Sequence, residues 1–136
     1  MKKILITGVS GYIAQHCAAQ LLSKGYAVKG SIRNEHKQKE ITEGFLNHNI
    51  SIEHLEFCKL DLLNDNGWEQ AMNGCDYVFH IASPYAIKVP KKENEIITPA
   101  VEGTLRALKF AKKNRNKKIN THFVYCGHDR TRFKEK

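Results

Sequence analysis

Short apolar runs alternate with longer segments of helical spacing along most of the chain. The runs of strand length are residues 3–7, 27–32, 54–58, 76–81 and 122–126. Between them, apolar residues recur every three or four positions, as on one face of a helix, over residues 12–24, 35–46, 68–72 and 99–113. Strands that alternate with helices in this way predict an α/β fold with a parallel sheet and crossover helices.

The last of these helices has an apolar stripe of its own. Pro99 fits the first turn of a helix, where its missing N–H costs nothing. Val101, Leu105 and Leu108 then fall on one side of the helix. We therefore expect this helix to begin at about Pro99 and to pack on the sheet through these three side chains.

The connection between the first strand and the first helix contains small residues spaced three apart, Gly8, Gly11 and Ala14. Gly8 lets the chain turn directly off the strand, and Gly11 lets the backbone approach a ligand closely. Ala14 lets the helix lie close to the sheet. Because the N-terminus of a helix offers free N–H groups and a positive dipole, this spacing predicts a phosphate-binding turn rather than an ordinary connection.

The composition is that of a single soluble domain. The chain has 136 residues, of which 41% are apolar and 26% charged. No apolar run approaches the ~20 residues that span a bilayer. The apolar run after Lys3 is also too short for a signal peptide, because Thr7 and Gly8 interrupt it. The four cysteines show no C-x-x-C spacing, which favours a reducing compartment. We therefore expect a cytoplasmic protein.

All of the net charge of +8 lies near the C-terminus. Residues 1–108 hold 12 basic and 12 acidic residues, whereas residues 109–136 hold 10 basic and two acidic ones. A nucleic-acid or acidic partner is one interpretation, but few aromatic residues interleave with the charges. A solvated helix end, where cations suit the dipole, is favoured; its basic residues are Lys112, Lys113, Arg115, Lys117 and Lys118. His122, Cys126 and His128 lack a fourth ligand, so no metal site is predicted.

Five segments in order carry a resemblance to a known family: TGVSGYIA, GSIRN, KLDLL, GCDYVFHIASP and PAVEGTLRALKFA. Together they resemble the extended short-chain dehydrogenase/reductases, and most closely the dihydroflavonol reductase and cinnamoyl-CoA reductase branch. The resemblance covers about residues 3–118. It implies an incomplete Rossmann fold with about five parallel strands in the order 3-2-1-4-5 and helices on both faces. We expect the dinucleotide-binding domain over residues 1–126 and a basic tail outside the family over 127–136.

The resemblance also implies the residues of a cofactor site. The pyrophosphate would be surrounded by Gly8, Ser10, Gly11, Tyr12 and Ile13, the adenine by Asp61 and Leu62, and the nicotinamide-side ribose by Ile81, Ala82 and Ser83. Simpler interpretations remain for single residues: Asp61 could cap a turn, and Ser83 could belong to a strand-ending loop. His80 is expected to be a neutral strand residue.

The end of the second strand indicates which dinucleotide would bind. An acidic residue there would bind the ribose hydroxyl of NAD and repel a 2′-phosphate, whereas an arginine attracts the phosphate. The chain has Arg33 at this point, followed by Lys37 and Lys39. NADP is therefore favoured over NAD, although Glu35 lies nearby.

The catalytic residues of the family are missing. The resemblance implies a tyrosine acid, a lysine four residues later and a serine, yet no Tyr-x-x-x-Lys occurs and no serine follows Ser83. We therefore expect an NADP(H)-binding domain of a carbonyl oxidoreductase, truncated before its catalytic residues and inactive alone. The alternative is a non-catalytic pseudoenzyme that senses the cofactor or pairs with a full-length relative. Because the family's later elements would cover the sheet, we also expect a chain that self-associates.

Overall fold

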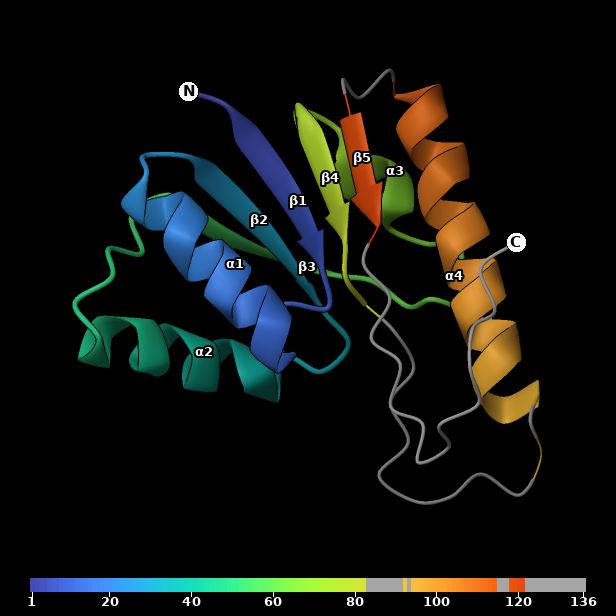
Figure 1. Ribbon diagram of the computed structural model, residues 1–136, viewed down its shortest axis with the longest axis horizontal. Coiled ribbons are helices and arrows are strands. Elements are labelled where there is room, and N and C mark those ends of the chain that lie inside the picture. The colour runs from blue at the N-terminus through green and yellow to red at the C-terminus, as the bar shows by residue number, and fades with distance from the viewer. Residues whose placement is uncertain (83–91, 93, 115–117, 122–136) are drawn as a thin grey trace, which may run out of the picture.

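Five parallel strands form one sheet in the order β3-β2-β1-β4-β5 in the computed structural model, which describes residues 1–82, 92, 94–114 and 118–121 (Figure 1). The strands are β1 Lys3–Thr7, β2 Ala27–Ile32, β3 Leu55–Lys59, β4 Tyr77–His80 and β5 Lys118–Thr121. The helices are α1 Tyr12–Ser23, α2 His36–Asn47, α3 Trp68–Met72 and α4 Asn94–Lys113. This architecture confirms the predicted Rossmann-like α/β fold and its strand order.

The central strand β1 is buried on both faces, as its unbroken apolar run predicts. Ile4 and Ile6 pack with residues of α1 and α2, whereas Leu5 packs with residues of α3 and α4. The sheet therefore has two separate cores, with α1 and α2 on one face and α3 and α4 on the other (Figure 1).

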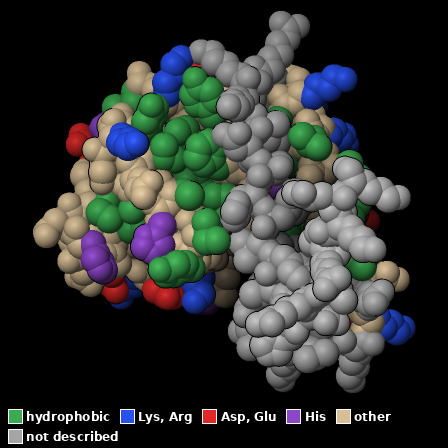
Figure 2. Space-filling model, in the orientation of Figure 1, with side chains coloured by type: hydrophobic (Ala, Val, Ile, Leu, Met, Phe, Trp, Pro, Cys, Tyr) green, Lys and Arg blue, Asp and Glu red, His purple; other side chains and the backbone are tan. Residues whose placement is uncertain are grey.

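On the face of α1 and α2, the apolar side chains of Tyr77, Phe79 and Ile81 are only partly buried. Figure 2 views the molecule from this side and shows apolar side chains gathered at the surface, next to the residues drawn in grey. Apolar surface therefore adjoins β4 here.

The C-terminal part of the fold differs from the sequence-based prediction in its boundaries. Helix α4 begins at Asn94, five residues before the predicted start, and contains Pro99 in its interior. One missing N–H near the N-terminus of a 20-residue helix removes a single hydrogen bond, which the rest of the helix tolerates. The fifth strand begins at Lys118, opposite Tyr77 of β4; Lys118 is therefore not part of a helix end. The predicted strand over 122–126 lies outside the described residues.

The buried face of α4 was also predicted wrongly. Val101, Leu105 and Leu108 are 52%, 61% and 42% exposed. The residues that pack on the core are Gly103, Ala107, Phe110 and Ala111. Small residues occupy the buried face because they let the helix lie close to its neighbours. A Cβ on Gly103, for example, would lie 2.6 Å from Cδ2 of Leu62. The larger side chains of Val101, Leu105 and Leu108 lie at the surface instead.

Candidate dinucleotide-binding site

The turn after β1 is fixed by steric contacts that only glycine permits. Gly8 has φ +68°, and a Cβ there would lie 2.8 Å from the Cβ of Ala82. The next residue, Val9, is fully buried against Gly30 of β2, where a Cβ would approach Cγ1 of Val9 to 2.6 Å. Gly30 was not singled out from the sequence, although a glycine inside a strand is a signal of close approach.

Hydrogen bonds from the end of β2 anchor this turn. The N–H of Gly8 donates to Oγ of Ser31 at 2.9 Å, and the N–H of Val9 donates to the carbonyl of Ser31 at 2.9 Å. The N–H of Gly11 then donates to the carbonyl of Gly8 at 3.0 Å. The start of α1 is therefore held in one place relative to β1 and β2. Ser31 is a site residue that the sequence analysis missed.

The N-terminus of α1 offers its N–H groups without a side-chain cap. Its N-cap residue is Gly11, no side chain caps it, and no acidic residue lies in the first turn. Ser10 and Tyr12 are exposed at this end, and Ile13 is half-buried. Ala14 is fully buried, as expected for a helix that lies close to the sheet. The five residues predicted around a pyrophosphate thus lie together at a helix end that suits an anion: Gly8, Ser10, Gly11, Tyr12 and Ile13.

A buried network joins the ends of β1 and β4. Oγ1 of Thr7 accepts hydrogen bonds from the N–H groups of Ile81 and Ala82, each at 3.0 Å, and lies 2.9 Å from Nδ1 of His80. Because its two lone pairs are used, the hydroxyl donates to His80, whose Nδ1 must then be unprotonated. Burial lowers the pKa of His80 to about 4, so its ring is neutral at pH 7. This network sets Ile81 and Ala82 beside Gly8.

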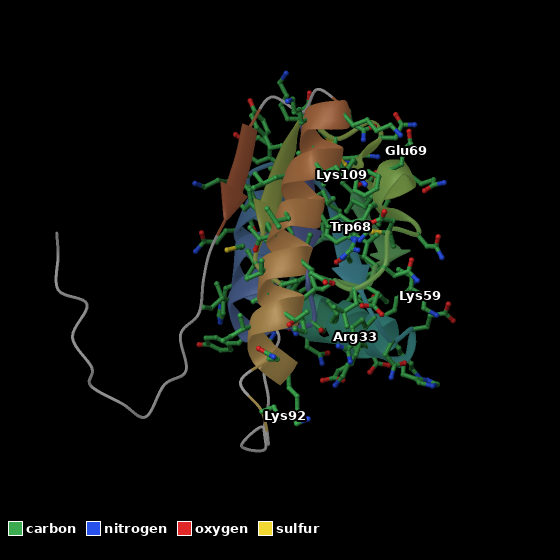
Figure 3. All side chains as sticks on the ribbon, turned by 90° about the vertical axis from the view of Figure 1, so that its right-hand side faces the viewer. Arg33, Lys59, Trp68, Glu69, Lys92 and Lys109 are labelled. Carbon is green, nitrogen blue, oxygen red and sulfur yellow. The ribbon has the colours of Figure 1, made fainter. Side chains whose placement is uncertain are left out.

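A pocket of about 360 Å³ opens at the ends of β2 and β3. It is lined by Arg33, Lys59, Leu60, Asp61, Asn64, Asn66 and Gly67. Arg33 and Lys59 lie on the same side of the molecule in Figure 3. Oδ1 of Asp61 accepts a hydrogen bond from the N–H of Leu63 at 2.9 Å, so this carboxylate both caps a turn and faces the pocket.

Of the described residues predicted near the adenosine end of the cofactor, Lys37 and Leu62 are absent from the pocket lining. Lys37 forms an ion pair with Glu40 along α2, with Nζ and Oε2 3.0 Å apart. The side chain of Leu62 packs against Gly103 instead. Ser83 lies outside the described residues. Lys59 was missed, although its position at the end of a strand beside β2 could have indicated it.

Other chemistry finds little support in the part of the chain that the structure describes. Within it, no three His, Cys, Asp or Glu side chains gather as a metal site would require, and His122, Cys126 and His128 fall outside it. Cys17 and Cys58 are free thiols, and Sγ of Cys75 donates a hydrogen bond to the carbonyl of Ala71 at 3.3 Å. Burial raises the pKa of Cys58 to about 11, so this thiol is no ready nucleophile. None of the described helices has the length and apolar character needed to cross a membrane.

Curated proteins similar to this chain are plant reductases. Tetraketide alpha-pyrone reductase 1 of Arabidopsis thaliana is 36% identical over 112 residues, which are 82% of this chain and 34% of that protein. The bifunctional dihydroflavonol 4-reductase/flavanone 4-reductase of Malus domestica is 33% identical over 82% of this chain and 32% of its own length. The chain thus spans about a third of the length of the curated relatives it matches.

Solved structures share the fold. The yeast methylglyoxal/isovaleraldehyde reductase complexed with NADPH superposes with a TM-score of 0.70 at 28% identity, over 82% of this chain and 33% of that one. The UDP-glucose 4-epimerase of Bifidobacterium longum, in complex with NAD⁺ and UDP, gives 0.71 at 27% identity, over 88% and 36%. The model of the NAD dependent epimerase/dehydratase family matches residues 4–130. With the fold and the glycine turn described above, this match shows that the chain belongs to the NAD dependent epimerase/dehydratase family, among the extended short-chain dehydrogenase/reductases related to dihydroflavonol and cinnamoyl-CoA reductases.

Proposed function

We propose that this chain binds NADP(H) as the cofactor-binding part of a carbonyl reductase of the dihydroflavonol reductase type. The observation that carries the proposal is the uncapped N-terminus of α1, held behind Gly8 by a hydrogen bond to Ser31 of β2 and by the close approach of Ala82, which follows β4. Backbone N–H groups fixed in this way fit a pyrophosphate, because they can donate hydrogen bonds to the anion and no side chain caps them. The nicotinamide of a bound NADPH would supply the hydride for reduction.

The arrangement of the two ends of the site supports a dinucleotide rather than a mononucleotide. The pocket at β2 and β3 contains Arg33 and lies on one side of the glycine turn. Ile81 and Ala82 lie on the other side, at the end of β4. A ligand that extends across the turn would therefore place its adenosine near Arg33 and its nicotinamide near Ala82. Arg33 favours the 2′-phosphate of NADP over the free hydroxyl of NAD.

Catalysis is not part of this proposal. The 136 residues contain no Tyr-x-x-x-Lys, and no serine follows Ser83. No tyrosine is therefore followed by the lysine that would lower its pKa for proton donation. We propose that the chain alone binds the cofactor without reducing a carbonyl, and we place it in the cytoplasm, where thiols such as those of Cys17 and Cys58 stay reduced.

Titration with NADPH tests the proposal. The wild type should quench or shift NADPH fluorescence saturably at one site per chain. Gly11→Ala should weaken binding about tenfold, because one methyl group at the N-cap intrudes where the phosphate approaches. Gly11 has φ −74°, which alanine also adopts, and a Cβ there would lie 3.3 Å from the carbonyl oxygen of Gly8, a contact that a small shift relieves; this variant should therefore remain folded.

Gly44→Ala is the matched control for this titration. Gly44 lies within α2, and a Cβ there would meet nothing within 4 Å. Its substitution should leave the affinity unchanged. The proposal is wrong if the wild type fails to bind NADPH, or if both variants bind as the wild type does.

A second proposal concerns the exposed stripe of α4, which supports a partner-binding role. The stripe consists of Ile97, Val101, Leu105 and Leu108, all 42% to 61% exposed. Glu95 and Glu102 lie in the first half of the helix, and Lys109 and Lys112 in the second. We propose that two copies of the chain pair antiparallel along this stripe, which brings acidic and basic halves together. One helix pair buries less than the ~1,600 Å² of a standard interface, so the dimer should be weak.

A further inference from the structure

We propose that Lys59 binds the same phosphate as Arg33 and selects the 2′-phosphorylated dinucleotide. This inference rests on the proposed function, since it assigns a specificity residue within the cofactor pocket. The charges after the second strand pointed to Arg33 and Lys37. In the structure, Lys59 lines the pocket together with Arg33, whereas Lys37 pairs with Glu40 and is absent from the pocket lining.

The register of the sheet places Lys59 next to Arg33. Lys59 is the last residue of β3 and lies opposite Ile32, the last residue of β2. The N–H of Leu60 donates to the carbonyl of Ile32 at 3.2 Å, which ties the two strand ends together just where Arg33 begins. Both basic side chains line the pocket of about 360 Å³. A phosphate in this pocket would therefore meet a cation from each strand.

The charges around the pocket leave these two cations available. Among the described residues, Arg33 and Lys59 form no ion pair, whereas Lys37 pairs with Glu40 and Lys39 pairs with Glu43 on α2. Of the residues that the structure describes, Asp61 alone contributes a carboxylate to the pocket lining, and one of its oxygens already accepts the N–H of Leu63. Two cations against one carboxylate leave a net positive charge. This charge suits a phosphate dianion better than a neutral hydroxyl.

The opposite wall of the pocket is close and polar. Gly67 has φ +85°, and a Cβ there would lie 3.0 Å from the carbonyl oxygen of Lys59. The segment before α3 therefore packs closely against the end of β3. Asn64 and Asn66 complete this wall, and Oδ1 of Asn64 accepts the N–H of Asn66 at 2.9 Å. Their amide groups add neutral donors beside the cations.

Affinity measurements on paired lysine variants test the inference. Dissociation constants for NADPH and NADH are measured on the wild type, Lys59→Gln and Lys37→Gln in low salt. Lys59→Gln should weaken NADPH binding about tenfold, the value of one charge-assisted hydrogen bond, and NADH binding less than about twofold. Lys37→Gln should change neither affinity by more than about twofold, since its charge is already paired on α2. Both lysines are exposed, so both variants should keep the wild-type circular dichroism.

A smaller probe and a rescue variant sharpen the result. The wild type should bind 2′-AMP more tightly than 5′-AMP, and Lys59→Gln should remove this preference. Lys59→Arg should keep most of the NADPH affinity, because it retains the charge. If the wild type binds NADPH and Lys59→Gln binds it equally well, or loses NADPH and NADH affinity alike, the inference about Lys59 is wrong and the proposed function stands. If the wild type binds neither dinucleotide, both are wrong.

Discussion

The turn after β1 and the helix α4 both place a glycine against a neighbouring side chain, but only the glycine of the turn has a backbone conformation that requires it. At the turn, Gly8 occupies a conformation and a space that no other residue can take. On α4, two faces carry apolar residues, and the face with Gly103 and Ala107 packs inside while the face with Leu105 stays out. A strained backbone position can therefore be recognised from its glycine alone. An apolar stripe on a helix does not by itself show which face is buried, because that depends on the element packed against it.

Substitution of Gly8 should have the largest effect. Gly8→Val forces a β-branched residue to φ +68° and into Ala82, 2.8 Å from where its Cβ would lie. We expect a loss of about 4 kcal/mol in the free energy of unfolding, measured by urea denaturation. Gly44→Ala should change it by less than about 1 kcal/mol. A Gly8→Val protein as stable as the wild type would contradict the steric account of the turn.

The two faces of α4 can be separated with one pair of variants. Ala107→Asp buries a carboxylate where the side chain is now fully enclosed, and should cost about 3 kcal/mol in the free energy of unfolding. Leu105→Asp should change it by less than about 0.5 kcal/mol, because Leu105 is 61% exposed.

The same Leu105→Asp variant tests the proposed self-pairing of α4. Sedimentation velocity of the wild type should show a concentration-dependent dimer, and the variant should remain monomeric. A wild type that is monomeric at all concentrations would rule out the pairing. Pairing unaffected by Leu105→Asp would place the interface elsewhere, for example on the apolar surface beside β4.

Acid should weaken the junction between β1 and β4 before it affects surface ion pairs. Burial holds the pKa of His80 at about 4, below its value of 6.5 in the unfolded chain. Stability is therefore complete above pH 6.5 and falls as the pH drops from 6.5 toward 4, by on the order of 2–3 kcal/mol. His80→Gln should flatten this part of the pH profile, whereas substitution of the exposed His48 by Gln should not.

Carboxylates add to acid sensitivity only at lower pH. The hydrogen bond from Arg106 lowers the pKa of Asp65 below 3.8, and the hydrogen bond from Lys3 lowers that of Glu56 below 4.5. Each of these stabilising effects is present above the unfolded-state pKa and is lost as the pH falls through the folded one. A wild type whose stability is constant from pH 6.5 to 5 would contradict the assignment of a neutral, buried His80.

The glycine turn could be predicted because a local pattern determines it, whereas the strand order was predicted from the resemblance to a known family. β1 has an unbroken apolar run, and Gly8 and Gly11 follow it directly. The contribution of β3 to the pocket depends instead on register: Lys59 lines the pocket with Arg33 because Ile32 and Lys59 are opposite each other in neighbouring strands. No spacing within the sequence shows this pairing, so the sequence indicated Lys37 and not Lys59.

The first residues of α4 and β5 were harder to predict, because the local sequence does not mark them. Pro99 was expected to begin a helix, but five residues before it already adopt helical geometry. The start of β5 at Lys118 depends on pairing with Tyr77 across the sheet, and a lysine gives no local sign of a strand. Tertiary contacts set these boundaries.

The most direct test of the central claim is to follow backbone amide signals by NMR while NADPH is added. We predict saturable shifts at the amides of Ser10 to Ile13, at Ala82 and around Lys59, with the exposed stripe of α4 unchanged. Shifts confined to α4, or no saturable shift at the N-terminus of α1, would contradict the assignment of this turn as the cofactor site.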